Sequence, residues 1–528
     1  MHNILEQIPN LRKTAAELVQ LQSPLQKIRE AFHLECSTRR LPHKHVVHFC
    51  TAPTGVGKTL ALLAYAMRLC EKYNADRIIV VTPFLTLCRQ HESNYKEWFT
   101  TDIGNASSSG RYTSKKDRSE TKKWQKEITV TSYVDLLRTF SSLNPYKSRM
   151  DLSEKAEKLA NTILILDDAD QWIQPHMAPH VLGCLQHLLA HNCHSILISA
   201  TLPRYWEIDG MIPLPMPVVE IALPANVKIP SRVKMTLHDN FVVRDIINII
   251  NAHPNEPGVI VVNTVHTAIL LQVFLQKFYG KKKDVGLLTG KLASYHRREK
   301  ERIYAEKLSR RDGNFILVAT SCIQAGWDVS FGYGLREAAS LADILQTRGR
   351  INRSGEYGLY APLHVFTFGD EPLAKPHPGL RKAIACLDLL WTNTKYPPGP
   401  ERCTDAMRAL LTQSPSVFDR QKRIKNFAKL NAHKDTLKTL LPDLFSNTTA
   451  FPPLDCIKNR VIREKVSLGQ LDEDTMEYLL SINPGQAKLL ERIGFKRMLN
   501  RAGKPYYVLN NVVYSRDTGL YIKTDQEE

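Results

Sequence analysis

The segment VVHFCTAPTGVGKTLALLAYAMRL, residues 46–69, constrains the fold of this chain more than any other. Its apolar start predicts a buried strand, Gly55 and Gly57 predict a tight turn, and apolar residues recur at helical spacing from Leu60. A strand–turn–helix unit of this kind surrounds an anion with backbone N–H groups at the positive end of a helix. We therefore expect a nucleotide-phosphate site made by Thr54, Gly55, Val56, Gly57, Lys58 and Thr59.

The chemistry of this loop implies ATP and Mg²⁺ as cofactors. Lys58 would reach the β- and γ-phosphates, and the Thr59 hydroxyl would ligate magnesium. The pattern usually begins with Gly, and Ala52 stands there instead.

An acidic cluster follows a second apolar run, in ILILDDAD at residues 163–170. Acidic residues at the end of a buried strand commonly hold a cation, so Asp167 is predicted to ligate magnesium. Asp168 would then orient and deprotonate the attacking water as a catalytic base. The alternative is that the cluster only caps a helix, because Asp is a favourable N-cap residue.

The alternation of strands and helices continues through SILISATLPRYW, restarts after the proline-rich segment 211–232, and runs to about residue 370. Two such series predict an α/β fold with two parallel-sheet lobes and a cleft between them. Across this cleft, Arg350 and Arg353 of QTRGRINR would stabilise charge on the γ-phosphate, and Gln346 would align nucleotide and water. The alternative for such an arginine cluster is a solvated basic surface.

The bulk composition bears on partners and location. A formal net charge of +18 and a pI near 9.3 favour a polyanionic partner, nucleic acid before anionic lipid. No apolar stretch approaches the roughly 20 residues that a membrane-spanning helix needs, so no membrane partner is expected. The ten cysteines are scattered without a C-x-x-C pair, which fits the reducing cytoplasm. The polar basic segment 101–127 is expected to be a solvated loop, or else a mobile arm that binds nucleic acid or a partner protein.

The ordered motifs resemble those of superfamily 2 helicases over roughly residues 20–370. In detail the chain resembles most the type I CRISPR-associated interference helicase, the helicase half of the Cas-three helicase-nuclease. The likeness is carried by APTGVGKT, VVNTVHTA, LLTGKLASYHRREKE and FGYGLREAASLADILQTRGRINRSG. It implies two tandem RecA-like lobes, at 1–215 and 216–370, followed by a C-terminal accessory domain at 371–528.

Carried over residue by residue, the resemblance implies further site residues. Gln26 of SPLQKIREAF would read adenine, although a Gln on an amphipathic helix is as often solvated. Gly326 and Asp328 would couple the strand site to the nucleotide ribose. Single-stranded nucleic acid would be bound without sequence preference by Thr82, Pro83, Thr131, Asn263, Thr264, Thr320 and Ser321.

The chain departs from the family pattern at several places. Asp168 stands where the family has Glu, and Thr347 stands where motif VI usually has Arg, with Arg348 one place later. Shortening the catalytic carboxylate by one methylene can cost ~10²-fold in rate. The other nucleotide residues are present, so hydrolysis is expected to be retained. The family's His-Asp nuclease domain is not expected, because only about fifty residues precede the phosphate loop and the one His-Asp pair is His238-Asp239.

Together these features predict an ATP-dependent helicase that translocates along single-stranded DNA, 3′ to 5′ by resemblance. The resemblance also implies recruitment by an RNA-guided surveillance complex, with cutting by a separate nuclease subunit. One alternative is an RNA remodeller of the Asp-Glu-Ala-Asp box type, as Asp170 suggests, although that class begins motif VI with His rather than Gln346. The other alternative is an ATP-gated nucleic-acid clamp with little hydrolysis.

Overall fold

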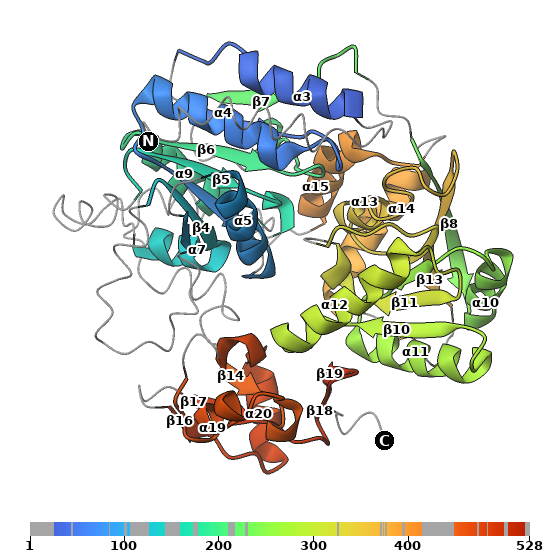
Figure 1. Cartoon of the computed structure of the whole chain (residues 1–528). Coiled ribbons are helices and arrows are strands. Elements are labelled where there is room, and N and C mark those ends of the chain that lie inside the picture. Colours follow the sequence, from blue (N-terminus) through green and yellow to red (C-terminus); the bar gives the residue numbers. More distant parts are fainter. Residues whose placement is uncertain are drawn as a thin grey trace. The chain divides into compact units, whose positions relative to one another are not determined.

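The structure is a computed structural model of the chain (Figure 1). It describes residues 26–43, 46–83, 85–99, 103–105, 126–142, 159–171, 173, 178–209, 217–227, 231–324, 327–369, 372, 374, 377–392, 397–413, 448–471, 475–482, 484–500 and 505–522. These residues form two compact units. Unit 1 holds the described residues of Met1–Ser108, Asp117–Pro230 and Cys386–Leu440, and unit 2 holds those of Ser231–Ala385 and Leu441–Glu528.

Unit 1 is built on a seven-stranded sheet in the order β3-β4-β2-β5-β6-β1-β7, in which every pairing is parallel. The strands are Val47–Cys50 (β1), Arg77–Thr82 (β2), Ile103–Asn105 (β3), Ile128–Ser132 (β4), Thr162–Leu166 (β5), Cys193–Ile198 (β6) and Val218–Ile221 (β7). Strands β1, β4, β5 and β6 are buried along their whole length. Burial on both faces explains why such strands read as continuous apolar runs rather than as alternating patterns.

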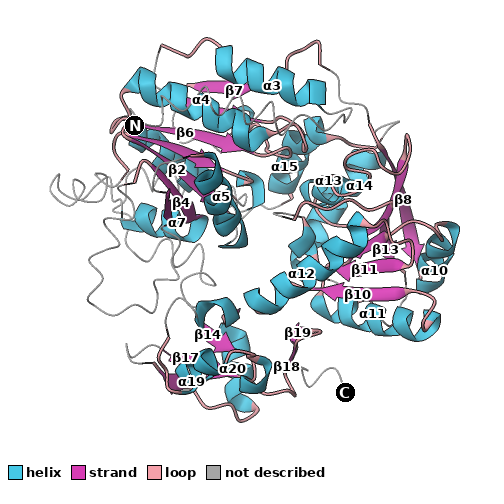
Figure 2. Cartoon of the chain, viewed as in Figure 1, coloured by secondary structure: helices cyan, strands magenta, loops and turns pink. Residues whose placement is uncertain are grey.

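Four described helices of unit 1 pack against this sheet (Figure 2): Lys58–Tyr73 (α4), Leu85–Trp98 (α5), Tyr133–Ser142 (α7) and Ala178–Leu189 (α9). Helix Gln26–Thr38 (α3) packs on α4, and helix Cys403–Thr412 (α15) contacts the segment after β6 through the Thr404–Arg204 hydrogen bond. Helix α15 belongs to unit 1 although it follows the whole second sheet in the sequence. The chain therefore returns to unit 1 after building most of unit 2.

Unit 2 contains a second parallel sheet, with six strands in the order β10-β11-β9-β12-β13-β8. Its strands are Val233–Phe241 (β8), Gly258–Val261 (β9), Asp284–Leu288 (β10), Phe315–Ala319 (β11), Tyr333–Glu337 (β12) and Ala361–Phe368 (β13). Its helices are Val243–Ala252 (α10), Val265–Tyr279 (α11), Ser294–Ser309 (α12) and Leu341–Arg348 (α13), and Arg381–Thr392 (α14) spans the boundary between the units.

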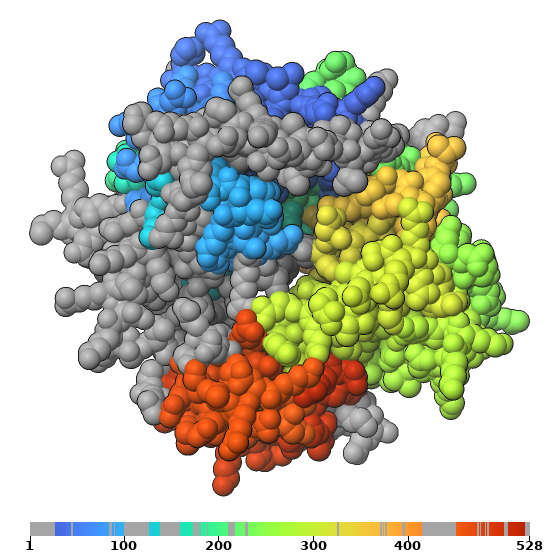
Figure 3. Space-filling view, in the orientation of Figure 1, coloured from blue at the N-terminus to red at the C-terminus, as the bar shows by residue number. Residues whose placement is uncertain are grey.

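The C-terminal residues of unit 2 form a small mixed sheet, in the order β15-β14-β17-β16, and a hairpin, β18–β19. The strands are Thr448–Phe451 (β14), Leu480–Ile482 (β15), Met498–Leu499 (β16), Pro505–Val508 (β17), Tyr514–Ser515 (β18) and Gly519–Leu520 (β19), and the helices are Arg460–Ser467 (α19) and Pro484–Arg492 (α20). In the space-filling view these residues, orange to red, lie directly against the yellow-green segment that contains α12 (Figure 3).

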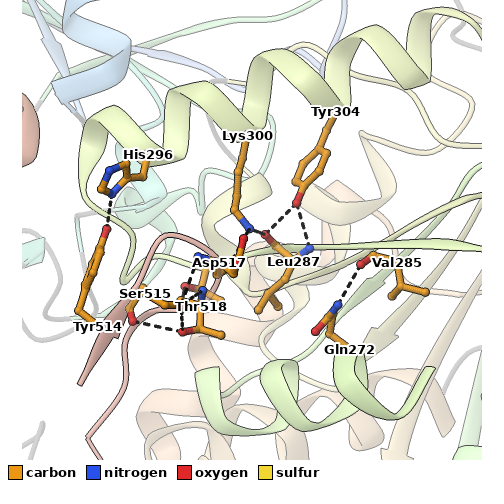
Figure 4. Close-up of polar contacts among 12 residues, drawn as sticks. Gln272, Val285, Leu287, His296, Lys300, Tyr304, Tyr514, Ser515, Asp517 and Thr518 are labelled. Carbon is orange, nitrogen blue, oxygen red and sulfur yellow. Dashed lines mark hydrogen bonds and ion pairs between the residues drawn. The ribbon is translucent and has the colours of Figure 1, made fainter. Parts of the chain in front are cut away.

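A buried histidine joins α12 to this C-terminal region (Figure 4). His296 Nε2 lies 3.0 Å from the carbonyl oxygen of Cys456, and Nδ1 lies 2.7 Å from the Tyr514 hydroxyl. A carbonyl can only accept, so Nε2 carries the proton and Nδ1 accepts from Tyr514. Lys300, one turn further along α12, donates to the carbonyl oxygen of Asp517 at 2.9 Å. Two polar side chains of α12 are therefore hydrogen-bonded to the C-terminal region.

The structure confirms the predicted fold class: two parallel-sheet α/β lobes with a C-terminal region. The predicted limits at 215/216 and 370/371 stay predictions. Within the proline-rich segment 211–232, residues Val218–Ile221 form β7 and pair with β1. Segment 101–127 lies almost wholly outside the described residues. No described helix is both long enough and apolar enough to cross a bilayer.

The core strand β1 carries a histidine that predicts a pH-dependent stability. His48 is buried and accepts or donates a 3.1 Å hydrogen bond with the Tyr65 hydroxyl. Burial, followed by the charges of His194 and Arg39, lowers the pKa of His48 from its ordinary value of 6.5 to about 3. Because the folded pKa lies below the unfolded one, stability is complete above pH 6.5 and is lost as the pH falls toward 3, at about 1.4 kcal/mol per pH unit.

We expect the melting temperature of His48→Gln to lie below that of the wild type at pH 7.5, because the Tyr65 contact is weakened. The gap should narrow at pH 5.5, because the imidazole of His48 is then protonated in the unfolded wild type but stays neutral in the folded one, which lowers the stability of the wild type alone. Thermal unfolding at the two pH values measures this gap, with His43→Gln at an exposed position as the control. A gap that stays constant would show that His48 does not govern the acid sensitivity.

Candidate nucleotide and nucleic-acid site

The phosphate loop follows β1 and has the backbone that an anion site needs. Gly55 and Gly57 have φ angles of 83° and 78°, a left-handed conformation that glycine adopts without steric cost. Gly57 is the N-cap of α4, so the free N–H groups of the first turn face outward at the loop. Lys58 Nζ donates to the carbonyl oxygens of Ala52 at 3.0 Å and Pro53 at 3.1 Å. The lysine is thus already held over the loop.

An arginine from α3 reinforces this loop. Arg29 Nε donates a 2.9 Å hydrogen bond to the carbonyl oxygen of Gly55. Its Cγ would lie 3.7 Å from a Cβ placed on Gly57, so the side chain runs along the loop. The guanidinium adds positive charge beside the predicted phosphate site. Gln26, three residues earlier, is the first residue of α3, and its side chain lies outside the described residues.

Asp167 follows β5 and has its carboxylate anchored through both oxygens. Its Oδ2 lies 3.1 Å from His91 Nε2, and its Oδ1 accepts the Asp168 backbone N–H at 3.1 Å. Burial alone would raise the pKa of Asp167, but the His91 hydrogen bond and the nearby charges, among them that of Lys58, lower it. An ionised carboxylate and the Thr59 hydroxyl are hard oxygen donors, which fits Mg²⁺.

Asp168 adopts a left-handed backbone conformation, with φ of 43°. Its carbonyl oxygen accepts the Gln171 N–H at 3.0 Å, which closes the turn leading into the short helix Ala169–Gln171. Asp enters this conformation more readily than most residues because its short polar side chain bonds locally. The turn therefore favours Asp over the longer Glu that the family pattern has at this place.

The segment Ser199-Ala200-Thr201 (S-A-T), which follows β6, is hydrogen-bonded to the acidic turn at residues 167–170. Thr201 Oγ1 donates to Asp170 Oδ2 at 2.5 Å, and the Thr201 N–H donates to Ser199 Oγ at 3.1 Å. Strand β6 lies between β5 and β1 in the sheet, so S-A-T lies between the acidic turn and the phosphate loop. The Thr201–Asp170 hydrogen bond therefore connects S-A-T directly with the acidic turn.

Three residues that the sequence analysis did not single out, Glu220, Thr404 and Arg408, make hydrogen bonds around S-A-T. Glu220 Oε1 of β7 accepts from Thr51 Oγ1 at 2.9 Å and from Arg204 Nη2 at 3.1 Å, so it bridges the phosphate-loop strand and the segment after S-A-T. From α15, the Thr404 hydroxyl accepts the Arg204 N–H at 3.0 Å, and Arg408 donates to the Glu207 carbonyl oxygen at 2.8 Å.

The predicted strand-binding residues of unit 1 lie at adjacent strand ends. Val81 of β2 pairs with Thr131 of β4, which places Thr82 and Thr131 at one edge of the sheet. Both threonine side chains are buried, as is Pro83, and Thr82 Oγ1 lies 3.0 Å from Cys88 Sγ. Their contact with nucleic acid stays a prediction.

In unit 2, the predicted strand-binding residues take part in internal hydrogen bonds. Asn263 Oδ1 accepts from Arg336 Nη1 at 2.7 Å, and the Asn263 N–H donates to Glu337 Oε2 at 2.7 Å. Arg336 is only 1% exposed, so Asn263 helps to satisfy a buried charge. Thr264 caps α11 by accepting the Thr267 N–H at 3.1 Å. Asn263 and Thr264 therefore each stabilise unit 2 through hydrogen bonds, and their contact with nucleic acid stays a prediction.

The second predicted pair of unit 2 follows β11. Thr320 Oγ1 accepts the Gly290 N–H at 3.3 Å, while Ser321 is exposed. Gly326 lies outside the described residues, and Trp327 between it and Asp328 is buried.

The segment QTRGRINR, residues 346–353 (motif VI), packs onto the segment after β11. Arg350 Nη2 donates to the Gln324 carbonyl oxygen at 2.6 Å, and Arg353 Nε lies 3.0 Å from Asp328 Oδ1. Gln346 on α13 is 5% exposed. The sequence predicts five nucleotide residues in unit 2. Four of them, Gln346, Arg350, Arg353 and Asp328, lie on α13, in the segment after it or in the segment after β11, and the fifth, Gly326, lies outside the described residues.

The departure at Thr347 has a local cause. Thr347 is buried, donates to the Asp343 carbonyl oxygen at 3.0 Å and accepts from Gln324 Nε2 at 3.3 Å. An Arg at this inward position would bury a charge at a large desolvation cost. Arg348, one residue later, is half-buried and donates to Ser231 Oγ at 3.4 Å.

Two protein families match the chain. Residues 33–208 match the DEAD/DEAH box helicase family, and residues 255–356 match the C-terminal part of the CRISPR-associated nuclease/helicase Cas3. Each match covers less than half of the chain, so each shows that its own segment is similar to the named family. The predicted resemblance to superfamily 2 helicases and to the helicase half of Cas3 is confirmed. No curated protein matches the sequence.

Solved structures agree with the Cas3-like helicase fold. The crystal structure of T. fusca Cas3-AMPPNP gives a TM-score of 0.66 at 13% identity, covering 94% of this chain and 70% of that chain. T. fusca Cas3 gives 0.67 at 12% identity, covering 96% and 72%. A CRISPR RNA-guided surveillance complex, pre-nicking, gives 0.63 at 14% identity, covering 94% and 70%. At these identities the likeness shows the shared fold.

The hydrogen bond between Arg29 and the phosphate loop generates a prediction. Arg29→Ala should raise the KM for ATP by about 10- to 100-fold, because a charge-assisted hydrogen bond to the loop is worth about 1.5–3 kcal/mol. Steady-state ATPase kinetics measure the change, and Arg29→Lys should recover part of the loss. Arg39→Ala is the control, since Arg39 lies just beyond the end of α3 and pairs with Glu35. An unchanged KM in Arg29→Ala would contradict this role.

Proposed function

We propose that this chain is an ATP-dependent helicase that moves along single-stranded DNA. The observation that carries the proposal is the meeting of three strand ends at one edge of the first sheet. The phosphate loop follows β1, Asp167 follows β5, and Ser199–Thr201 follow β6. Ligands of open α/β sheets bind outside the carboxyl ends of the strands. The Thr201–Asp170 hydrogen bond joins Ser199–Thr201 to the acidic turn, and we propose that it couples the nucleotide site to the nucleic-acid side.

The proposed hydrolysis begins with ATP phosphates bound at the first turn of α4. Lys58 exchanges its bonds to the loop carbonyls for bonds to phosphate oxygens. Thr59 and Asp167 would hold Mg²⁺, which when bound neutralises charge on the β- and γ-phosphates. Asp168 orients the attacking water and accepts its proton.

Unit 2 is proposed to complete the reaction with Gln346, Arg350 and Arg353. An arginine that reaches the γ-phosphate stabilises the charge of the transition state, which raises kcat by ~10³–10⁵-fold. Arg350 now donates to the carbonyl oxygens of Ile323 and Gln324, and Arg353 pairs with Asp328. Both arginines would exchange these partners for phosphate oxygens. ATP binding would therefore remove the contacts of Arg350 and Arg353 with the segment after β11.

The choice of DNA and of a CRISPR role is a further part of the proposal. It is supported by the net charge of +18 and by the similarity in fold to the solved structures of T. fusca Cas3 and of a CRISPR RNA-guided surveillance complex. We propose 3′ to 5′ movement, recruitment by such a complex in the cytoplasm, and cutting by a separate nuclease subunit. The residues proposed for the strand are Thr82, Pro83, Thr131, Asn263, Thr264, Thr320 and Ser321, and those proposed for the base and ribose of ATP are Gln26, Gly326 and Asp328.

The deciding experiment is ATP turnover with magnesium and saturating single-stranded DNA, compared with RNA of the same sequence. DNA should stimulate turnover well above a Lys58→Ala control, and a duplex with a 3′ overhang should be unwound in preference to one with a 5′ overhang. Stimulation by RNA alone would favour an RNA remodeller. Binding of ATP and DNA with no turnover above Lys58→Ala would favour an ATP-gated clamp.

The base role of Asp168 is tested by Asp168→Asn. Asn tolerates the left-handed conformation of this residue and has nearly the same volume, so the substitution removes the carboxylate with little strain. We expect kcat to fall by at least ~10²-fold, as for loss of a general base, while affinity for a non-hydrolysable ATP analogue changes little. Asp209→Asn, at an exposed position of unit 1, is the matched control. Normal turnover in Asp168→Asn would remove Asp168 from this role.

A further inference from the structure

A buried histidine contacts the predicted magnesium ligand from a helix outside the motifs. His91 lies on α5 and is 5% exposed, and its Nε2 is 3.1 Å from Asp167 Oδ2. The other oxygen, Oδ1, accepts the Asp168 N–H at 3.1 Å. Each carboxylate oxygen therefore has its own anchor, and only one of the two anchors is a side chain.

The imidazole is itself held in place by the face of α5 that packs inward. Cys88, His91 and Tyr95 share this face at positions i, i+3 and i+7. Cys88 Sγ lies 3.0 Å from Thr82 Oγ1 at the end of β2, and the buried Tyr95 ring lies beside the His91 ring with centroids 5.5 Å apart. Among the described residues His91 Nδ1 is buried without a hydrogen-bond partner. The polar contact of the ring is thus directed at Asp167.

We propose that His91 is a positioning residue that fixes the Asp167 carboxylate for the metal that accompanies ATP. This proposal rests on the proposed function, because it assigns a partner to the ligand of that same site. A hydrogen bond to one carboxylate oxygen restricts rotation of the group, so the remaining lone pairs keep one direction. Partners of this kind typically change metal affinity by ~10–100-fold when they are removed.

The competing interpretation is that His91 only fills space in the core. Two amide substitutions separate the interpretations, because both keep a polar side chain at a buried position. The side-chain N–H of Gln can occupy the place of His Nε2, whereas that of Asn reaches only the place of Nδ1. If the contact to Asp167 matters, His91→Gln should retain function and His91→Asn should lose it. If packing alone matters, His91→Asn, which changes the side-chain volume more than His91→Gln does, should lower the thermal stability of the protein and leave its affinity for the metal unchanged.

The experiment is a titration of the full chain with Mn²⁺ in the presence of AMP-PNP, followed by electron paramagnetic resonance. His91→Asn should weaken Mn²⁺ binding by ~10–100-fold, and His91→Gln should lie close to the wild type. Binding of a fluorescent ATP analogue in EDTA should be equal in all three proteins. Thermal unfolding checks that the variants are folded, and His91→Gln remains informative if His91→Asn is not. Equal Mn²⁺ affinity in the two variants would overturn the proposal.

This readout does not depend on hydrolysis, so the two proposals fail in different ways. Wild type that binds Mn²⁺ with AMP-PNP but never turns over ATP would refute the helicase proposal and leave the role of His91 standing. Wild type that hydrolyses ATP, with unaltered Mn²⁺ affinity in His91→Asn, would refute the role of His91 alone. Wild type that binds no Mn²⁺ with the nucleotide would refute both.

Discussion

Parallel pairing of β5, β6 and β1 is the constraint on which the candidate site depends. Leu164 pairs with Ser195, and Ile196 pairs with His48, so the three strands run in one direction and end at one edge. The phosphate loop, the acidic turn and S-A-T follow those ends directly. The strands are buried along their length, and a shift of register would move apolar side chains out of place. The hydrophobic core thereby sets the positions of the polar groups.

Local sequence patterns were enough to predict the parts of the fold that are determined locally. The glycine turn before Lys58 and the apolar run before Asp167 each require one specific backbone, and the structure has both. Contacts between distant segments were not predictable in this way. Arg29, His91 and Glu220 reach the site from α3, α5 and β7, and nothing in their neighbouring residues indicates which carbonyl or carboxylate they will meet.

The departures from the family pattern at Asp168 and Thr347 have local structural reasons and do not indicate that the nucleotide site has been lost. Asp168 occupies a left-handed turn that suits a short polar side chain, so the residue type and the backbone agree. A Glu would restore the length of the carboxylate but would enter this conformation less readily. Thr347 faces the inside of unit 2, where its hydroxyl is satisfied by Asp343 and Gln324. Both substitutions are therefore compatible with an intact nucleotide site.

The sequence by itself determined the two parallel-sheet lobes, the phosphate loop and the acidic residue at the end of β5, because periodicity, glycine and strand-end chemistry are local properties. Only the tertiary structure decided that His91 anchors Asp167, that Arg29 braces the loop, and that α15, after the second sheet, packs beside S-A-T. Such contacts depend on how strands and helices stack in three dimensions. Stacking is a property of the whole core, and no short segment of the chain contains it.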